Sequence, residues 1–256
     1  MTFKKKANAY LKLGKSFYRL PSLEEIDFDG TLAEFDSSSL QSSTLLKKLD
    51  LGNACKVLDN ALSGLASLEE VYVPVQQNVK TLGLQSLEHL KKVVININDE
   101  NALSSLDVGL LNDVKADEIL FESSGNALSS VNSGALSGLA VKAIDFHLSK
   151  MHEVTSGAFR DDVSLAKVTY GPLQLTSVQE NAFEGCNEVI LADAYGSSYL
   201  KEMHPHGAKQ LTLQRMYSNT CLQRVYASAF MNVKLEHPVL NAPMLVNAEE
   251  YAFANV

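Results

Sequence analysis

The feature that most constrains the fold of this chain is a short pattern that recurs along most of its 256 residues. The pattern has an aliphatic residue, three mostly polar or small residues, an alanine and then a large apolar residue. Its clearest copies are Val57–Leu62, Val131–Leu136, Val154–Phe159, Val178–Phe183 and Val225–Phe230. With the weaker copies included, the spacing is about 24 residues per unit, a period typical of solenoids. The sequence therefore predicts a stack of small units.

A second element follows the first at a regular offset. It has a leucine and then, three positions later, three residues that alternate apolar, variable and apolar. Alternation with a period of two predicts a strand, and the earlier leucine leads the chain into it. The best copies are Leu23–Phe28, Leu46–Leu51, Leu68–Val73, Leu90–Ile95 and Leu165–Tyr170. Stacked units would pair these strands in one parallel sheet, with the apolar positions facing a continuous core.

The combined unit resembles the BspA-like (Treponema-type) leucine-rich repeat. Glu180–Cys186 matches that repeat best, and Pro74 stands where the family often ends its strand. The resemblance implies an α/β-type solenoid: a right-handed superhelix of about ten units of about 24 residues. One parallel β-sheet would form one face, with short irregular or helical segments opposite. The sequence departs from the family where Leu replaces Phe in most early units and where residues 200–245 are irregular.

The repeat also sets the expected domain organisation. Residues 1–20 are expected to form a degenerate N-terminal unit or lid, and residues 21–256 the solenoid. The last pattern, in Tyr251–Val256, is followed by no capping segment. Because a solenoid needs polar caps, we expect either a longer protein or a partner that covers this end.

The composition agrees with a repeated slot of fixed size. There is no Trp and only 7% aromatic residues, so aliphatic side chains must fill the core. The net charge of -8 argues against a nucleic-acid partner, which would need a basic surface. No apolar run is long enough for a signal peptide or a transmembrane segment. We therefore expect a cytoplasmic protein by default, or a cell-surface or secreted one if the chain is a fragment of a longer family member.

The outward strand positions form two predicted rows across the sheet. The row nearer the strand starts alternates in sign, and neighbouring parallel strands lie about 4.8 Å apart, so each charge would have opposite charges beside it. We favour a charge ladder that fixes the register, with a charged recognition surface as the alternative. The ladder consists of Glu25, Lys48, Glu70, Lys92 and Glu118, and Ala143, Lys167, Glu188 and Gln210 would continue the row.

The second row lies two residues further along each strand, and its middle would expose apolar groups side by side. Such a patch is typical of contact with a protein partner. However, tyrosine and valine also have a high propensity for strands, whether or not a partner binds. Both interpretations stay open, and Tyr72 is the first candidate for an anchor. The predicted binding face consists of Asp27, Asp50, Tyr72, Val94, Leu120, Asp145, Thr169 and Ile190.

Catalytic, metal-binding and cofactor-binding motifs are not evident. His204 and His206 flank a proline and have no second ligand pair at zinc spacing. Asp27, Asp29 and Asp50 could meet at one end of the sheet, but they lack a calcium-loop pattern, and a solvated acidic face is favoured. Cys186 is interpreted as a small buried residue. We therefore expect no catalytic residue, no metal and no cofactor.

These observations favour a non-enzymatic protein–protein interaction module. It would bind a protein or a cell-surface ligand through the sheet face, and the resemblance implies adhesive roles. The alternative is a structural component of a larger assembly, or a fragment of a longer surface adhesin. End-to-end self-association belongs to that alternative.

Overall fold

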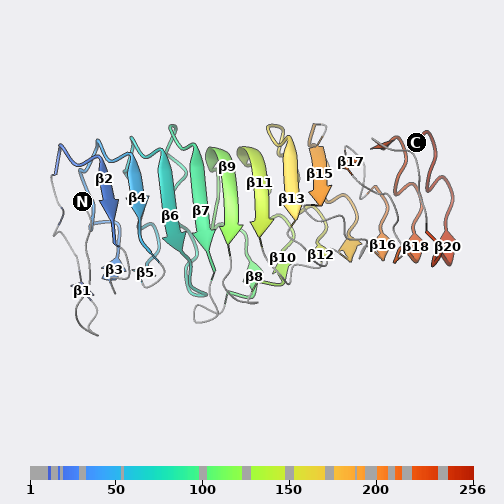
Figure 1. The fold of residues 1–256 in the computed structure, drawn as a ribbon, viewed down its shortest axis with the longest axis horizontal. Helices are drawn as coiled ribbons and strands as arrows, with labels where there is room; N and C mark the ends of the chain where they lie inside the picture. The colour runs from blue at the N-terminus through green and yellow to red at the C-terminus, as the bar shows by residue number, and fades with distance from the viewer. Residues whose placement is uncertain are drawn as a thin grey trace.

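The chain forms an elongated stack of turns in which strands lie side by side along the long axis (Figure 1). The computed structural model describes residues 11–12, 17, 20–28, 33–52, 55–97, 103–122, 128–147, 153–170, 176–187, 189–193, 201–206, 211–214, 221–235 and 242–256. The first and last strands, β1 (Leu11–Lys12) and β20 (Asn247–Ala248), lie at opposite ends of the stack. Each turn therefore contacts mainly its neighbours, as the repeat predicts.

A ten-stranded sheet in which every neighbouring pair is parallel runs the length of the stack. It contains the strand element of the sequence pattern. Its strands are β2 (Glu25–Asp27), β4 (Lys48–Asp50), β6 (Glu70–Pro74), β7 (Lys92–Asn96), β9 (Lys115–Glu122), β11 (Ala140–His147), β13 (Lys167–Tyr170), β15 (Val189–Asp193), β17 (Leu211–Gln214) and β19 (Lys234–Leu235). The prediction of one long parallel sheet face is confirmed.

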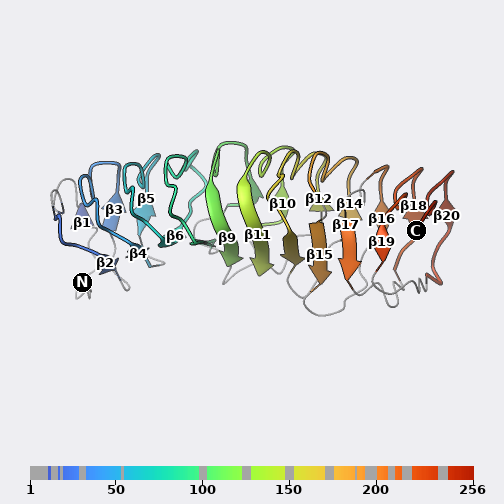
Figure 2. The ribbon, with the colours of Figure 1, turned by 90° about the horizontal axis from the view of Figure 1, so that it is seen from above.

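The opposite wall also contains parallel strands, which the sequence analysis did not predict. Seven short strands form one sheet: β8 (Ser105–Leu106), β10 (Ser130–Val131), β12 (Glu153–Val154), β14 (Ser177–Val178), β16 (Glu202–Met203), β18 (Arg224–Val225) and β20 (Asn247–Ala248). Three others form a second sheet: β1 (Leu11–Lys12), β3 (Ala33–Phe35) and β5 (Lys56–Val57). Figure 2 shows these strands along one side of the stack and the ten-stranded sheet along the other.

The expected helical segments are absent from the described part of the chain, where turns and the short strands form the wall. Across those same residues, no helix has the length and apolar character to cross a membrane. The fold is therefore a parallel β-solenoid. The count of about ten units and the right-handed sense of the superhelix stay predictions.

The core lies between the two walls and is built from equivalent positions of successive turns. The middle residues of the long-sheet strands, such as Ile26, Leu49 and Val71, are buried. From the other wall, Phe159 and Phe183 stack with ring centroids 4.8 Å apart, and both are fully buried. Apolar burial of this kind is the main term that stabilises the stack.

In every clear copy of the repeat pattern, the residue before the alanine has a left-handed backbone conformation. This conformation explains why glycine or asparagine stands there so often, because a Cβ atom makes positive φ costly for most residues. The positions and their φ angles are Asn60 (59°), Gly134 (71°), Gly157 (64°), Asn181 (54°) and Ser228 (56°). The alanine that follows, for example Ala158, is then buried against the next turn.

Two substitutions at this backbone position should change stability in opposite directions. We expect Gly157→Ala to lower the free energy of unfolding by about 1 kcal/mol, because alanine is strained at positive φ. Ser228→Gly should raise it by up to about 1 kcal/mol by relieving the same strain. Urea denaturation measures both, and Ser228→Ala is the control. Equal effects of Ser228→Gly and Ser228→Ala would contradict the explanation.

One carboxyl group is buried between two turns. Asp162 is almost fully buried, and its Oδ1 atom accepts a hydrogen bond of 2.6 Å from the backbone N–H of Leu139 in the preceding turn. Burial raises the pKa of this carboxyl group to about 8, against the backbone hydrogen bonds that favour its ionised form. The group therefore links adjacent turns at the cost of removing a carboxyl group from water.

This carboxyl group should make stability depend on pH. In the unfolded chain it ionises near pH 4, whereas in the folded protein it keeps its proton up to about pH 8. Its contribution to the free energy of unfolding should therefore fall as the pH rises from about 4 to about 8, and change little above that. Asp162→Asn should lack this part of the slope in urea denaturation at several pH values. The control, Asp113→Asn, alters an exposed carboxyl group in another turn and should keep it. Identical slopes for the wild type and Asp162→Asn would contradict the assignment.

Candidate functional site

The first outward row has the predicted alternation of charge. The strand pairing places Glu25, Lys48, Glu70, Lys92 and Glu118 opposite one another in that order. The Nζ atom of Lys48 lies 4.0 Å from Glu25 and 3.7 Å from Glu70, and that of Lys92 lies 3.8 Å from Glu118. These side chains are 41–61% exposed, so each ion pair stabilises the fold only slightly.

A second alternating column, which the sequence analysis missed, lies one residue earlier in each turn. It consists of Glu24, Lys47, Glu69, Lys91, Asp117 and Lys142. Lys91 pairs with Glu69, and Lys142 Nζ lies 2.6 Å from Asp117. The Lys91 contact lowers the pKa of Glu69 and raises that of Lys91. The alternating signs of this column are visible in the sequence. The sequence analysis considered only strand residues, and these residues lie just before the start of most strands.

The second outward row is continuous from β2 to β13. The pairing places Asp27, Asp50, Tyr72, Val94, Leu120, Asp145 and Thr169 on consecutive strands. All of them are half-buried except Leu120, which is only 8% exposed. The expectation that Leu120 forms part of an exposed patch is therefore wrong, because surrounding atoms cover it although it stands on the outer face.

Beyond β13, the pairing of the strands differs by two residues from the pairing that the predicted rows assume. The pairing places Ile190 opposite Lys167, and Ala192 opposite Thr169. We had expected Ile190 to follow Thr169 in the second row, so that placement is wrong by two residues. Thr212 on β17 pairs with Ile190. Glu188 and Gln210, expected in the first row, lie outside the described residues.

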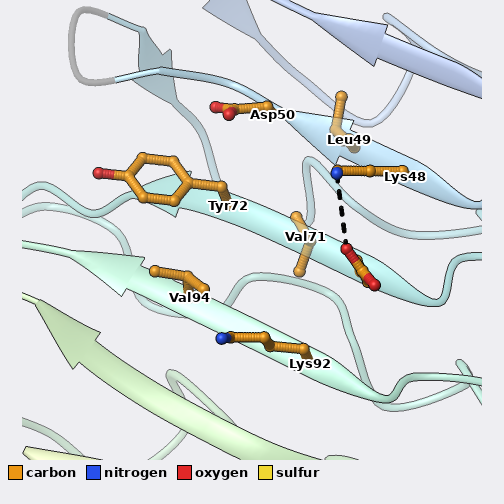
Figure 3. Close-up of a pocket in the computed structure, with 8 residues that line it drawn as sticks. Lys48, Leu49, Asp50, Val71, Tyr72, Lys92 and Val94 are labelled. Carbon is orange, nitrogen blue, oxygen red and sulfur yellow. Dashed lines mark ion pairs between the residues drawn. The ribbon is translucent and has the colours of Figure 1, made fainter.

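A shallow hollow of about 210 Å³ lies on the outer face between β4, β6 and β7. Figure 3 shows the two rows that line it: Asp50, Tyr72 and Val94 side by side, with Lys48 and Lys92 in the parallel row. The hydroxyl of Tyr72 contacts the side-chain amide of Asn96. Burial raises the pKa of Tyr72, and the Asn96 contact opposes this shift. Tyr72 is therefore held in place and stays neutral at physiological pH.

A third outward row follows the second on the longer strands, and the sequence analysis did not include it. Asn96, Glu122 and His147 stand opposite one another on β7, β9 and β11. His147 Nε2 lies 3.4 Å from the carboxylate of Asp145 in the second row. Burial raises the pKa of Asp145, while His147 opposes this shift. The signal for this row was the polar residue two positions after each second-row residue.

The histidines and cysteines singled out in the sequence lie away from this face. His204 stacks on Tyr226 with ring centroids 4.4 Å apart, and Cys186 is buried, with its thiol 2.9 Å from the carbonyl oxygen of Phe159. Burial raises the pKa of the Cys186 thiol to about 12. Within the described ranges, no three His, Cys, Asp or Glu side chains are grouped so that they could hold a metal ion.

Comparison with protein families identifies the class. The family model described as "BspA type Leucine rich repeat region" matches residues 13–106 and 90–194, with six copies of the repeat. These ranges cover more than half of the chain. The chain therefore belongs to the BspA-type leucine-rich repeat family, as the repeat pattern indicated.

The comparisons with curated protein sequences and with solved structures give weaker evidence than the family model. No curated protein sequence matches the chain. Among solved structures, the crystal structure of a TLR13–ssRNA13 complex is similar, with 14% sequence identity and a TM-score of 0.35. The match covers 86% of this chain and 43% of that one, so the chain spans less than half the length of the matched structure.

Reversing one charge in the ladder tests whether it stabilises the fold. Lys48→Glu should lower the free energy of unfolding by about 0.5–1 kcal/mol, because it sets three carboxylates on adjacent strands. Lys48→Met removes the charge without adding repulsion and should cost less. The difference between the two variants in urea denaturation should shrink at high salt. Equal stability of both variants at low salt would show that the ladder does not influence the fold.

Proposed function

We propose that this chain is a protein-interaction module that binds a protein partner through the outer face of its ten-stranded sheet. The observation that carries the proposal is the continuous second row, in which Tyr72 and Val94 stand side by side and line a hollow. Membership of a leucine-rich repeat family supports it, because stacked repeats of this kind create extended binding surfaces.

The face combines features of a binding surface. Tyr72 presents a large ring that is partly buried and fixed by its contact with Asn96. A fixed aromatic side chain loses little conformational entropy on binding, and tyrosine is enriched among the residues that dominate interface energies. The ion pairs of the first row border the apolar groups as a solvent-exposed rim.

A structural role in a larger assembly is the second candidate. The observation that favours it is that large apolar side chains are exposed in the turn formed by residues 242–256. Met244 is 51% exposed, Tyr251 is 70% exposed and Val246 is 85% exposed. A neighbouring molecule stacked on this turn would cover them. The sheet face is the stronger candidate because its groups are arranged around a hollow.

Site-specific photo-crosslinking tests the sheet-face proposal. A benzophenone amino acid in place of Val94 should crosslink a discrete partner in a lysate of the source cells. The same group in place of Val163, which is 60% exposed and lies outside the rows, should not. Adding Tyr72→Ala to the Val94 variant should reduce the crosslinked product about tenfold or more, as expected for an interface anchor.

Thermal unfolding followed by circular dichroism must show that both variants are folded. Equal crosslinking from the two positions, or crosslinking that does not depend on Tyr72, would contradict a binding site on this face.

A further inference from the structure

The second row differs from its neighbours in the sign of its charge. From β2 to β13 its charged residues are Asp27, Asp50 and Asp145, and no lysine or arginine stands in it. The lysines of the first row, Lys48 and Lys92, lie within 4.0 Å of first-row glutamates. The second row therefore presents only negative charge to a partner.

The order of residues along this row is also specific. Asp50 stands on β4 and Asp145 on β11, and the three strands between them contribute Tyr72, Val94 and Leu120. An apolar segment is thus bordered by a carboxylate at each end. Figure 3 shows one end of this arrangement, where Asp50 lies beside the ring of Tyr72.

Two buried acceptor atoms beside this segment receive no hydrogen bond from the described residues. One is Oδ1 of Asn96, a residue that is only 5% exposed and whose amide reaches Tyr72 in the row. The other is Oδ1 of Asp145. A buried acceptor without a donor is unfavourable, so a ligand that supplies donors gains the corresponding free energy. A ligand group with several hydrogen-bond donors would therefore suit both atoms.

We propose that the segment from Asp50 to Asp145 binds a protein segment that carries two basic side chains, one for each carboxylate, with apolar side chains between them. This inference rests on the proposed function and names the chemistry of the partner. Arginine suits the role best, because its several N–H groups can meet a carboxylate and a neighbouring acceptor at once. Charge complementarity also disfavours acidic partners.

The sheet geometry sets the spacing of the two basic groups. Four strand-to-strand steps separate β4 from β11, and they span roughly 19 Å. An extended partner that crosses the strands rises about 3.3 Å per residue, so its basic residues should stand about six positions apart. Positions one, three, five and seven of such a segment face the same side, which places two apolar residues over Tyr72 and Val94, the two partly exposed apolar residues of the segment.

Fluorescently labelled heptapeptides test this arrangement by anisotropy titration at low ionic strength. The matching probe is Arg-Ser-Leu-Ser-Leu-Ser-Arg, and the control has the same composition with the two arginines adjacent. We expect the matching probe to bind the full chain about tenfold more tightly. Asp50→Asn combined with Asp145→Asn should weaken its binding about three- to tenfold, the range for two partly exposed ion pairs. Glu180→Gln, an exposed change outside the row, should leave it unaltered.

The outcomes separate this inference from the proposed function. Equal binding of both peptides, or no binding of the matching one, would overturn the two-point basic recognition. If Tyr72→Ala weakens the matching peptide while the double asparagine variant does not, the face binds through apolar contacts alone. The proposed function then stands and the charge inference fails. The double variant keeps the shape of both side chains, and its thermal unfolding curve confirms that it is folded.

Discussion

The structure depends on the parallel, in-register pairing of each turn with the next. A single turn of about 24 residues cannot bury its own apolar side chains. Pairing brings equivalent residues of neighbouring turns together, so that inward positions such as Leu49 and Val71 meet in one core. The same pairing lines up the outward residues into rows. The core and the candidate binding face are thus two results of one set of backbone hydrogen bonds.

The electrostatics of the molecule differ between its two walls. On the outer face, alternating charges pair across strands and remain exposed to water, so each pair stabilises the fold only slightly. Between turns, the carboxyl group of Asp162 is removed from water to accept a backbone hydrogen bond. The surface charges can change during evolution at little cost, whereas the buried carboxyl group is tied to the geometry of two turns.

The long sheet and the pairing from β2 to β13 could be predicted from the sequence, because a leucine two residues before β2, β4, β6, β7 and β13 marks the start of these strands. The opposite wall could not be predicted as strands, since segments such as Ser130–Val131 are too short to show a period of two. The burial of Leu120 escaped prediction because it arises from surrounding atoms and not from the residue itself. The contact between Asp145 and His147 could not be predicted, because His147 belongs to the third row, which lies beyond the predicted strand element.

The displacement between β13 and β15 shows how such a face can be rearranged. Lys167 pairs with Ile190, two residues from the expected partner, and a shift of two keeps every side chain on its original side of the sheet. The paired residue is still of apolar type: Val168 pairs with Leu191, where Val189 was expected. A solenoid can thus give its outer residues new neighbours by gaining or losing two residues in a loop, with no substitution on the face and no polar residue turned into the core.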